Sequence, residues 1–262
     1  MIAYPAIDPV AFHIGSWPVY WYGIMYLLAF LFGWGILSLR IHYSPKPLLT
    51  QEQAADVVFY IAMGVILGGR LGYMFFYDWP VLWQDPWAVL RIWKGGMSFH
   101  GGLIGVALGL CWFARRNHCS LIDLGDLVAP AFPIGLGLGR IGNFINGELW
   151  GRASSVPWAM VFPNAGPLPR HPSQIYEFFL EGIVLFLILW FYSSRPRPRG
   201  AVSGMFLLCY GIFRFLVEFF REPDVQVGYI MGGVTEGQLL SLPLILFGIV
   251  LLKWAYRKRG RK

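Results

Sequence analysis

The feature that most constrains this chain is a series of apolar blocks, each about 20 residues long, separated by short polar segments. A bilayer core about 30 Å thick requires roughly 20 apolar residues per helix. The chain is 56% hydrophobic and 13% charged, which is more apolar than the core of a soluble protein of this length requires. We therefore expect an all-α integral membrane protein with a single multi-pass domain over residues 1–262. Seven helices are predicted near residues 18–40, 54–76, 97–115, 121–141, 172–192, 201–220 and 237–256.

The net charge of +7 would suggest a nucleic-acid partner in a soluble protein, but here it lies in loops and at the C-terminus. Basic loops of membrane proteins face the cytoplasm. The larger basic group lies on the side of the C-terminus and comprises Arg40, Lys46, Arg115, Arg116, Arg195, Arg197, Arg199, Lys253, Arg257, Lys258, Arg259, Arg261 and Lys262. The opposite side carries Arg91, Lys94, Arg140, Arg152, Arg170 and Arg221. These groups predict an outside N-terminus, a cytoplasmic C-terminus and no nucleic-acid partner.

Prolines and glycines predict where the helices break or pack. The longest polar connection, about residues 143–171, is rich in both and is expected to form a small extracytoplasmic cap. Pro130 and Pro133 precede several glycines in the fourth helix, which predicts a kink or break near its outer end. Gly64 and Gly68 have the four-residue spacing that lets membrane helices approach closely.

Two further patterns do not indicate a ligand site. The segment Gly137 to Gly142 satisfies GxGxxG, but it lies inside a membrane span and lacks the strand and helix that a dinucleotide site needs. Asp123 and Asp126 resemble part of a magnesium-binding motif whose remainder is absent, so we interpret them as solvated residues at a helix start. We expect no metal and no cofactor.

Ionisable side chains inside the apolar blocks share one predicted depth. Each costs about 2.5–3.5 kcal/mol in the bilayer centre, so each requires a reason. With a rise of about 1.5 Å per residue, Arg214 and Glu218 lie in the outer third of the membrane. The same layer receives Tyr22, Arg70, His100 and Arg140. A polar cavity that opens outward explains the set, while snorkelling of Arg70 and a structural ion pair between Arg214 and Glu218 remain alternatives.

The residue types in this layer suit a phospholipid. Arginine presents a fixed fork of donors that matches a phosphate and stays charged at any working pH. His100, with an ordinary pKa near 6.5, suits proton transfer around neutrality. Gly101 and Gly102 would leave backbone room beside it for a substrate.

Long motifs point to a family. Gly139 to Gly151 reads G-R-I-G-N-F-I-N-G-E-L-W-G, which resembles the signature of the bacterial phosphatidylglycerol–prolipoprotein diacylglyceryl transferases. The likeness extends over nearly the whole chain through W-Y-G from Trp21, G-G-R-L-G-Y from Gly68, G-G-M-S-F-H-G-G-L-I-G from Gly95, H-P-S-Q-I-Y-E from His171 and R-F-L-V-E-F-F-R from Arg214. Residues 152–169 match nothing that we can transfer from the family and look short for its outer loop.

The resemblance implies a seven-helix enzyme of the bacterial inner membrane, with its active site toward the extracytoplasmic leaflet. Such an enzyme transfers diacylglyceryl from phosphatidylglycerol to the lipobox cysteine of a prolipoprotein, which forms a thioether and releases glycerol phosphate in the first step of lipoprotein maturation. The catalytic residues implied are His100, Arg140 and Arg214. The substrate-binding residues implied are Tyr22, Arg70, Arg140, Asn143, Glu148, Gly151, Tyr210, Arg214 and Glu218.

Residue chemistry and resemblance combine into one hypothesis. A thiol with a pKa near 8.5 is mostly protonated at neutral pH, so its alkylation needs a base or a positive field. Arg140 and Arg214 would hold the phosphate, and His100 would remove the thiol proton. A transporter or channel would instead carry polar residues in both membrane halves, whereas the inner halves here are almost purely apolar. A non-catalytic lipid-binding protein would not need His100.

Overall fold

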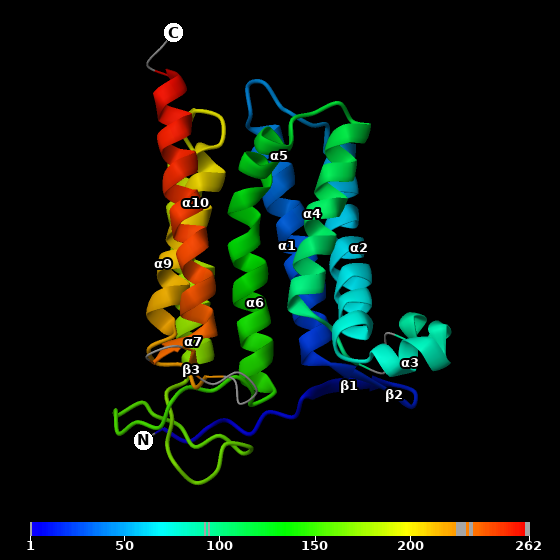
Figure 1. The fold of residues 1–262 in the computed structure, drawn as a ribbon, viewed down its shortest axis with the longest axis vertical. Helices are drawn as coiled ribbons and strands as arrows, with labels where there is room; N and C mark the ends of the chain where they lie inside the picture. Colours follow the sequence, from blue (N-terminus) through cyan, green and yellow to red (C-terminus); the bar gives the residue numbers. More distant parts are fainter. Residues whose placement is uncertain (1, 92, 94, 224–228, 231–232, 260–262) are drawn as a thin grey trace. The chain divides into compact units, whose positions relative to one another are not determined.

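The computed structural model describes residues 2–91, 93, 95–223, 229–230 and 233–259 (Figure 1). Lys94, Arg261 and Lys262, which entered the prediction of orientation, lie outside these residues. The chain forms two compact units. The first contains Met1–Ile36 with Gly125–Lys262, and the second contains Leu37–Leu124.

Helices occur at all seven predicted places. They are α1 (Trp21–His42), α2 (Gln51–Phe76), α4 (Phe99–Arg116), α5 to α6 (Leu121–Val128 and Phe132–Ile145), α7 to α8 (Ser173–Glu177 and Leu185–Ser193), α9 (Ala201–Val217) and α10 (Glu236–Arg259). Within the described residues, five helical stretches are long and apolar enough to cross a membrane: Trp21–His42, Gln51–Phe76, Leu121–Ile145, Ser173–Ser193 and Glu236–Arg257. Ala201–Val217 is a shorter apolar helix. The chain is therefore a multi-pass membrane protein.

The second unit is built on the pair α2 and α4, which run side by side (Figure 1). A Cβ atom added at Gly64 would lie 2.6 Å from the carbonyl carbon of Gly105. One added at Gly72 would lie 2.8 Å from Cα of Gly101. Only glycine permits backbones to approach so closely, so the packing role predicted from the glycine spacing is confirmed. Two short helices that the sequence did not predict, α3 (Trp79–Gln84) and η1 (Pro86–Leu90), connect the pair.

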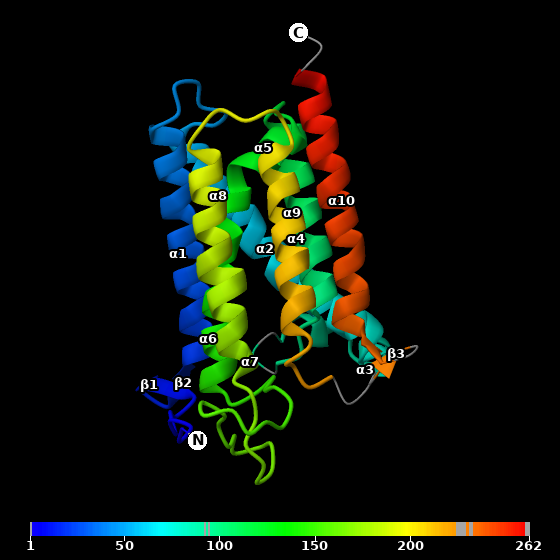
Figure 2. The same ribbon diagram turned by 90° about the vertical axis from the view of Figure 1, so that its left-hand side faces the viewer.

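The first unit pairs α9 with α10 and packs α6 against α7 and the π-helix η4 (Phe178–Val184) (Figure 2). Glycine again sets the separation, because an added Cβ at Gly211 would lie 2.8 Å from Cγ1 of Ile245. Gly137 and Gly182 meet in the same way, with an added Cβ on Gly137 only 3.1 Å from Cα of Gly182. These contacts hold the polar residues of several helices at short range.

The fourth predicted helix breaks at a different place from the one expected. The interruption is the 3₁₀ segment η3 (Ala129–Ala131), which lies nearer its start than its end. Pro130 has no N–H to donate and ends the α5 ladder there. Pro133 is tolerated because it occupies the first turn of α6. The glycines that follow stay helical, and Gly137 serves close packing.

Asp126 is also placed differently from the interpretation as a solvated residue. Its carboxylate accepts hydrogen bonds from the backbone N–H of Gly200 at 2.6 Å and from the N–H and Oγ of Ser203 at 2.8 and 2.7 Å. These donors belong to the first turn of α9, whose N–H groups have no partner inside the helix. Asp126 therefore caps a neighbouring helix, which a pattern within one segment does not reveal.

Short strands interrupt the all-helical picture. β1 (Val10–Ile14) pairs antiparallel with β2 (Trp17–Tyr20), and β3 (Tyr229–Ile230) pairs antiparallel with β4 (Val234–Thr235). In the connection between α6 and α7, isolated β-bridges pair Ala153 and Met160 with Arg170. Phe162 of this connection is fully buried. The hydroxyl of Tyr4 ties the N-terminal segment to this region by donating to the carbonyl of Phe144 at 2.6 Å.

Candidate active site

A buried carboxylate, Glu177, joins two arginines from different helices in the first unit. Arg140 comes from the last turns of α6 and places Nε 3.0 Å from Oε2 of Glu177. Arg214 comes from the end of α9 and places Nη1 2.6 Å from Oε1 of the same side chain. The Glu177 side chain is 0% exposed, whereas those of Arg140 and Arg214 are 18% and 12% exposed. One carboxylate thus holds two guanidinium groups at the edge of the buried region.

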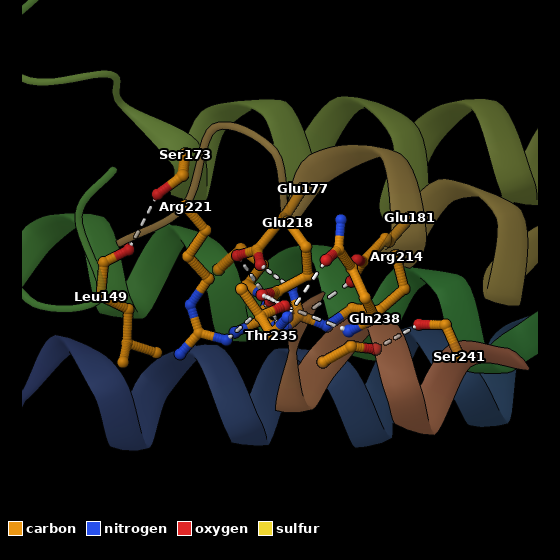
Figure 3. A network of polar contacts seen from close by, with 12 residues as sticks. Leu149, Ser173, Glu177, Glu181, Arg214, Glu218, Arg221, Thr235, Gln238 and Ser241 are labelled. Atoms are coloured by element: carbon orange, nitrogen blue, oxygen red, sulfur yellow. Dashed lines mark hydrogen bonds and ion pairs between the residues drawn. The ribbon is translucent and has the colours of Figure 1, made fainter. Parts of the chain in front are cut away.

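Glu218 extends this network toward α10 (Figure 3). Its Oε1 atom pairs with Arg214 one helical turn earlier and with Nη1 of Arg221 at 3.3 Å. Its Oε2 atom accepts a hydrogen bond of 2.7 Å from the hydroxyl of Thr235. The Oγ1 atom of Thr235 accepts a hydrogen bond of 3.2 Å from the backbone N–H of Gln238. Thr235 is thus the N-terminal cap of α10. The start of α10 is therefore connected to the arginines.

A second buried acid, Glu181, follows Glu177 by four residues on η4 (Figure 3). Its side chain is 0% exposed and its Oε2 atom lies 3.8 Å from Nη2 of Arg140. Neither of its oxygens has a hydrogen-bond partner among the described residues. The carboxylate is thus near a charge that balances it without being held by a direct hydrogen bond.

Asn143 and Glu148 form a hydrogen-bonded pair beside Arg140. The amide of Asn143 donates to Oε1 of Glu148 at 2.9 Å, and its Oδ1 atom lies 3.5 Å from Nη1 of Arg140. The backbone carbonyl of Glu148 accepts a 2.6 Å hydrogen bond from Nε2 of Gln174, which is fully buried. The end of α6 and the start of α7 are therefore tied together directly at the site.

Tyr22, Tyr210 and Gly151 also belong to the first unit. The Tyr22 ring packs on the backbone of Gly142, where an added Cβ would lie 2.7 Å from its Cδ2 atom. Tyr210 precedes Arg214 by one helical turn and stacks on Phe206 with an interplanar angle of 3°. Gly151 occupies a junction of three chain segments, where an added Cβ would lie 2.5 Å from the carbonyl oxygen of Phe220.

Arg70 and His100 lie in the second unit. Arg70 is 5% exposed, and its guanidinium donates to four backbone carbonyls: those of Ala88, Val89, Gly95 and Gly96. This arrangement supports a structural role, because it satisfies the carbonyls of the connection between α2 and α4. His100 is exposed in the first turn of α4, where its ring meets Phe99 edge to face at 5.6 Å. That His100 shares a layer with the arginines stays a prediction.

Glu177 and Glu181 were not singled out from the sequence. The signal was present, because two acids four residues apart in a block of apolar residues face the same side of a helix. The cost of burying ionisable groups in the membrane already required an explanation for both. Glu148 and Glu218 were predicted as acids of the site, but Glu177 and Glu181 were overlooked.

His171 lies outside the membrane segments, near the end of the connection between α6 and α7. Nδ1 of His171 lies 2.9 Å from the hydroxyl of Tyr176, which accepts a 2.6 Å hydrogen bond from Nε1 of Trp158. The His171 ring also meets Phe220 edge to face at 5.3 Å. Burial lowers the pKa of His171 because the cationic form loses hydration. Burial therefore favours the neutral form of the ring.

The fold and this network define a multi-pass membrane protein whose helix ends bury an arginine–carboxylate site. Residues 9–254 match the family described as prolipoprotein diacylglyceryl transferase. A relative from Coxiella burnetii (strain RSA 331 / Henzerling II) is 56% identical over 262 residues, which is 100% of both chains. A relative from Pseudomonas aeruginosa (strain LESB58) is 56% identical over 259 residues, which is 98% of this chain and 97% of the relative. Both relatives are named phosphatidylglycerol–prolipoprotein diacylglyceryl transferase.

This chain belongs to the prolipoprotein diacylglyceryl transferase family. The resemblance that the motifs indicated is thereby confirmed over the full length.

Proposed function

We propose that this enzyme transfers the sn-1,2-diacylglyceryl group of phosphatidylglycerol to the thiol of the lipobox cysteine of a prolipoprotein. The products are a thioether-linked lipoprotein precursor and glycerol phosphate, and the reaction is the first step of lipoprotein maturation. Full-length relatives named for phosphatidylglycerol and prolipoprotein support these substrates. The observation that carries the chemistry is the pair of arginines held by one buried carboxylate.

The helices and the basic loops support a membrane placement with seven spans. With α4 and α9 added to the five longer stretches, the chain crosses the inner membrane seven times. The 18 residues of α4 correspond to a length of about 27 Å at about 1.5 Å per residue. Basic loops place the C-terminus in the cytoplasm and the N-terminus outside. The ends of α6 and α9 and the starts of α7 and α10, which carry the network, then face the extracytoplasmic leaflet.

The arginines suit the phosphodiester of the lipid. A guanidinium offers parallel N–H donors to two phosphate oxygens, and such charge-assisted hydrogen bonds are roughly twice as strong as neutral ones. Arg140 and Arg214 come from α6 and α9, so together they enclose the phosphate from two sides. Charge grows on that phosphate as it leaves, and donors already in position stabilise this charge most effectively.

The covalent step is a displacement at carbon. The thiol sulfur of the peptide forms a C–S bond with the sn-3 carbon of the diacylglyceryl group, while the bond from that carbon to the phosphate oxygen breaks. The electron pair of the broken bond stays on glycerol phosphate, which the arginines hold. The thiol proton must pass to a base, because the thiolate is the reactive form, and His100 is the candidate base that the sequence offers.

The other polar residues orient the two arginines. Glu218 pairs with Arg214, and Asn143 lies between Arg140 and Glu148. Side chains held from two directions lose little freedom when the substrate binds, which favours a defined geometry at the reacting atoms. Tyr22, Tyr210 and Gly151 belong to the proposed substrate-binding set, together with Arg70 through the segment that it supports.

The proposed reaction is tested with purified protein, phosphatidylglycerol and a lipobox peptide. Mass spectrometry is expected to show one added diacylglyceryl group on the peptide cysteine. A peptide with serine in place of that cysteine serves as the control and should gain no mass. His100→Gln is expected to reduce turnover by about 100-fold or more, which is typical of a lost general base. Lipid binding without any mass gain by the wild type would refute the proposed activity.

A further inference from the structure

The carboxylate of Glu177 occupies a unique position in the network. Among the ion pairs of the described residues, it is the only acid that contacts both Arg140 and Arg214. Glu218 pairs with Arg214 and Arg221, and Glu181 approaches only Arg140. Removing Glu177 would therefore remove the carboxylate that links the two arginines directly.

The contact of Glu177 with Arg140 leaves room for a phosphate on that arginine, whereas both Nη atoms of Arg214 pair with the carboxylates of Glu177 and Glu218. On Arg140 it forms an ion pair with Nε at 3.0 Å, while the contacts of the two Nη atoms within the described residues are longer, at 3.5 Å to Asn143 and 3.8 Å to Glu181. The Nη edge of a guanidinium is a pair of parallel donors suited to two oxygens of one phosphate. Glu177 thus holds Arg140 from the side and leaves its end available.

Like charges provide the reason for such a bridge. Two guanidinium groups that bind one phosphate must lie close together before the phosphate arrives, and in a medium of low dielectric constant they repel strongly. A fully buried carboxylate between them offsets this repulsion. Glu177 is the last residue of α7, and two earlier residues of this helix fix its position. Oγ of Ser173 donates to the carbonyl of Leu149 at 2.9 Å, and Nε2 of Gln174 donates to that of Glu148 at 2.6 Å.

We propose that Glu177 is the positioning residue of the arginine pair, and that it sets the separation and direction of the two guanidinium groups for the departing phosphate. This inference rests on the proposed function, because it assumes that the arginines hold the lipid phosphate. Glu177 does not touch the substrate in this view. It acts on the rate through Arg140 and Arg214.

The alternative is that Glu177 competes with the lipid phosphate for the arginines. The two roles predict opposite effects of the isosteric change Glu177→Gln. A lost positioning residue lowers kcat, because donors misplaced by about 1 Å can reduce a rate by roughly 100-fold. A lost competitor frees both arginines and lowers KM for phosphatidylglycerol without lowering kcat.

The experiment measures kcat and KM for phosphatidylglycerol with a lipobox peptide in Glu177→Gln, Glu177→Asp and Glu222→Gln. Glu222 is the matched control, because its carboxylate pairs with Arg170 at 3.1 Å outside the network. We expect Glu177→Gln to lower kcat by about 100-fold, with KM changed by less than about 3-fold. Glu177→Asp keeps the charge but moves it by about one methylene, so kcat should fall by about 10-fold. Glu222→Gln should stay within about 2-fold of wild type.

Three results would overturn the inference. These are an unchanged kcat in Glu177→Gln, a lower KM for the lipid in that variant, or wild-type kcat in Glu177→Asp. The third result decides the question even when Glu177→Gln does not fold, because the aspartate variant retains the buried charge. Thermal melting of each purified variant separates loss of structure from loss of rate. Failure of the proposed function is distinct, since the wild-type protein itself would then give no diacylglyceryl product.

Discussion

The backbone N–H of Gly151 donates to the carbonyl of His171 at 2.8 Å and joins the two ends of the connection between α6 and α7. Gly151 also forms an antiparallel bridge with Arg221, which follows α9. A Cβ atom added at Gly151 would lie 2.5 Å from the carbonyl oxygen of Phe220 and 2.6 Å from that of His171. Three segments of the first unit therefore meet at a position that only glycine fits.

Replacement of Gly151 by alanine should displace one of these segments. We expect Gly151→Ala to lose most activity and to destabilise the protein by about 1–3 kcal/mol, because the clashing atoms are backbone atoms that cannot rotate away. Turnover and thermal melting in detergent measure both effects. Gly35→Ala is the control, since an added Cβ at Gly35 in α1 meets nothing within 4 Å. Equal melting temperatures and rates for both variants would contradict the role of Gly151.

Arg70 provides a test between a structural and a lipid-binding role. Its guanidinium donates to the carbonyls of four residues in the connection between α2 and α4. Arg70→Gln should destabilise the protein by about 2–4 kcal/mol, because buried carbonyls then lose their donors. KM for phosphatidylglycerol should change little in the fraction that stays folded. A higher KM with an unchanged melting temperature would instead favour the direct contact expected from the sequence.

The two arginines that Glu177 joins should act as a unit. Because each supplies donors to the same phosphate, Arg140→Ala and Arg214→Ala should each reduce kcat/KM by about 100-fold or more. The double variant should lose less than the product of the two single effects, because residues that act together are not additive. Steady-state kinetics of the three variants give the coupling. Little loss in Arg214→Ala beside complete loss in Arg140→Ala would rule out a two-arginine clamp.

The stability of the site region should depend on the titration of His171. Burial lowers the pKa of His171 below its ordinary value of about 6.5, so the unfolded chain binds a proton more readily than the folded one. Its contribution to stability is then fully present above about pH 6.5 and is lost as the pH falls through the folded pKa. We expect the melting temperature of the wild type to decrease over this range.

His171→Gln should weaken this dependence, since glutamine keeps a polar group near Tyr176 but does not titrate. Thermal melting between about pH 5 and 8 in both proteins provides the comparison. Identical pH profiles for the two proteins would exclude His171 as the source of the dependence.

Much of the fold was predictable because membrane helices are a local property of the sequence. Apolar runs of about 20 residues and the breaks between them located α1, α2, α4, α9 and α10 within a few residues. Glycine spacing also predicted close packing, as Gly64 shows against Gly105. Short elements were missed, because neither the strands near the N-terminus nor α3 carries an apolar run of sufficient length.

Part of the site was predictable for the same reason. The expense of ionisable groups in the membrane singled out Arg140, Arg214 and Glu218, and the structure places these three in one network. Which acid pairs with which arginine was not predicted from the sequence. The sequence pairs Arg214 with Glu218, four residues later, but the contact of Arg214 with Glu177 spans 37 residues.

The sequence by itself thus determined the places of the helices, the family and the kinds of charge within the apolar blocks, because each of these depends on residues close together in the chain. Only the tertiary structure decided that Glu177 joins two arginines, that Asp126 caps α9 and that Arg70 supports a neighbouring segment. The physical reason is that hydrogen bonds and ion pairs act over about 3 Å, and helix packing alone brings residues from distant segments within that range.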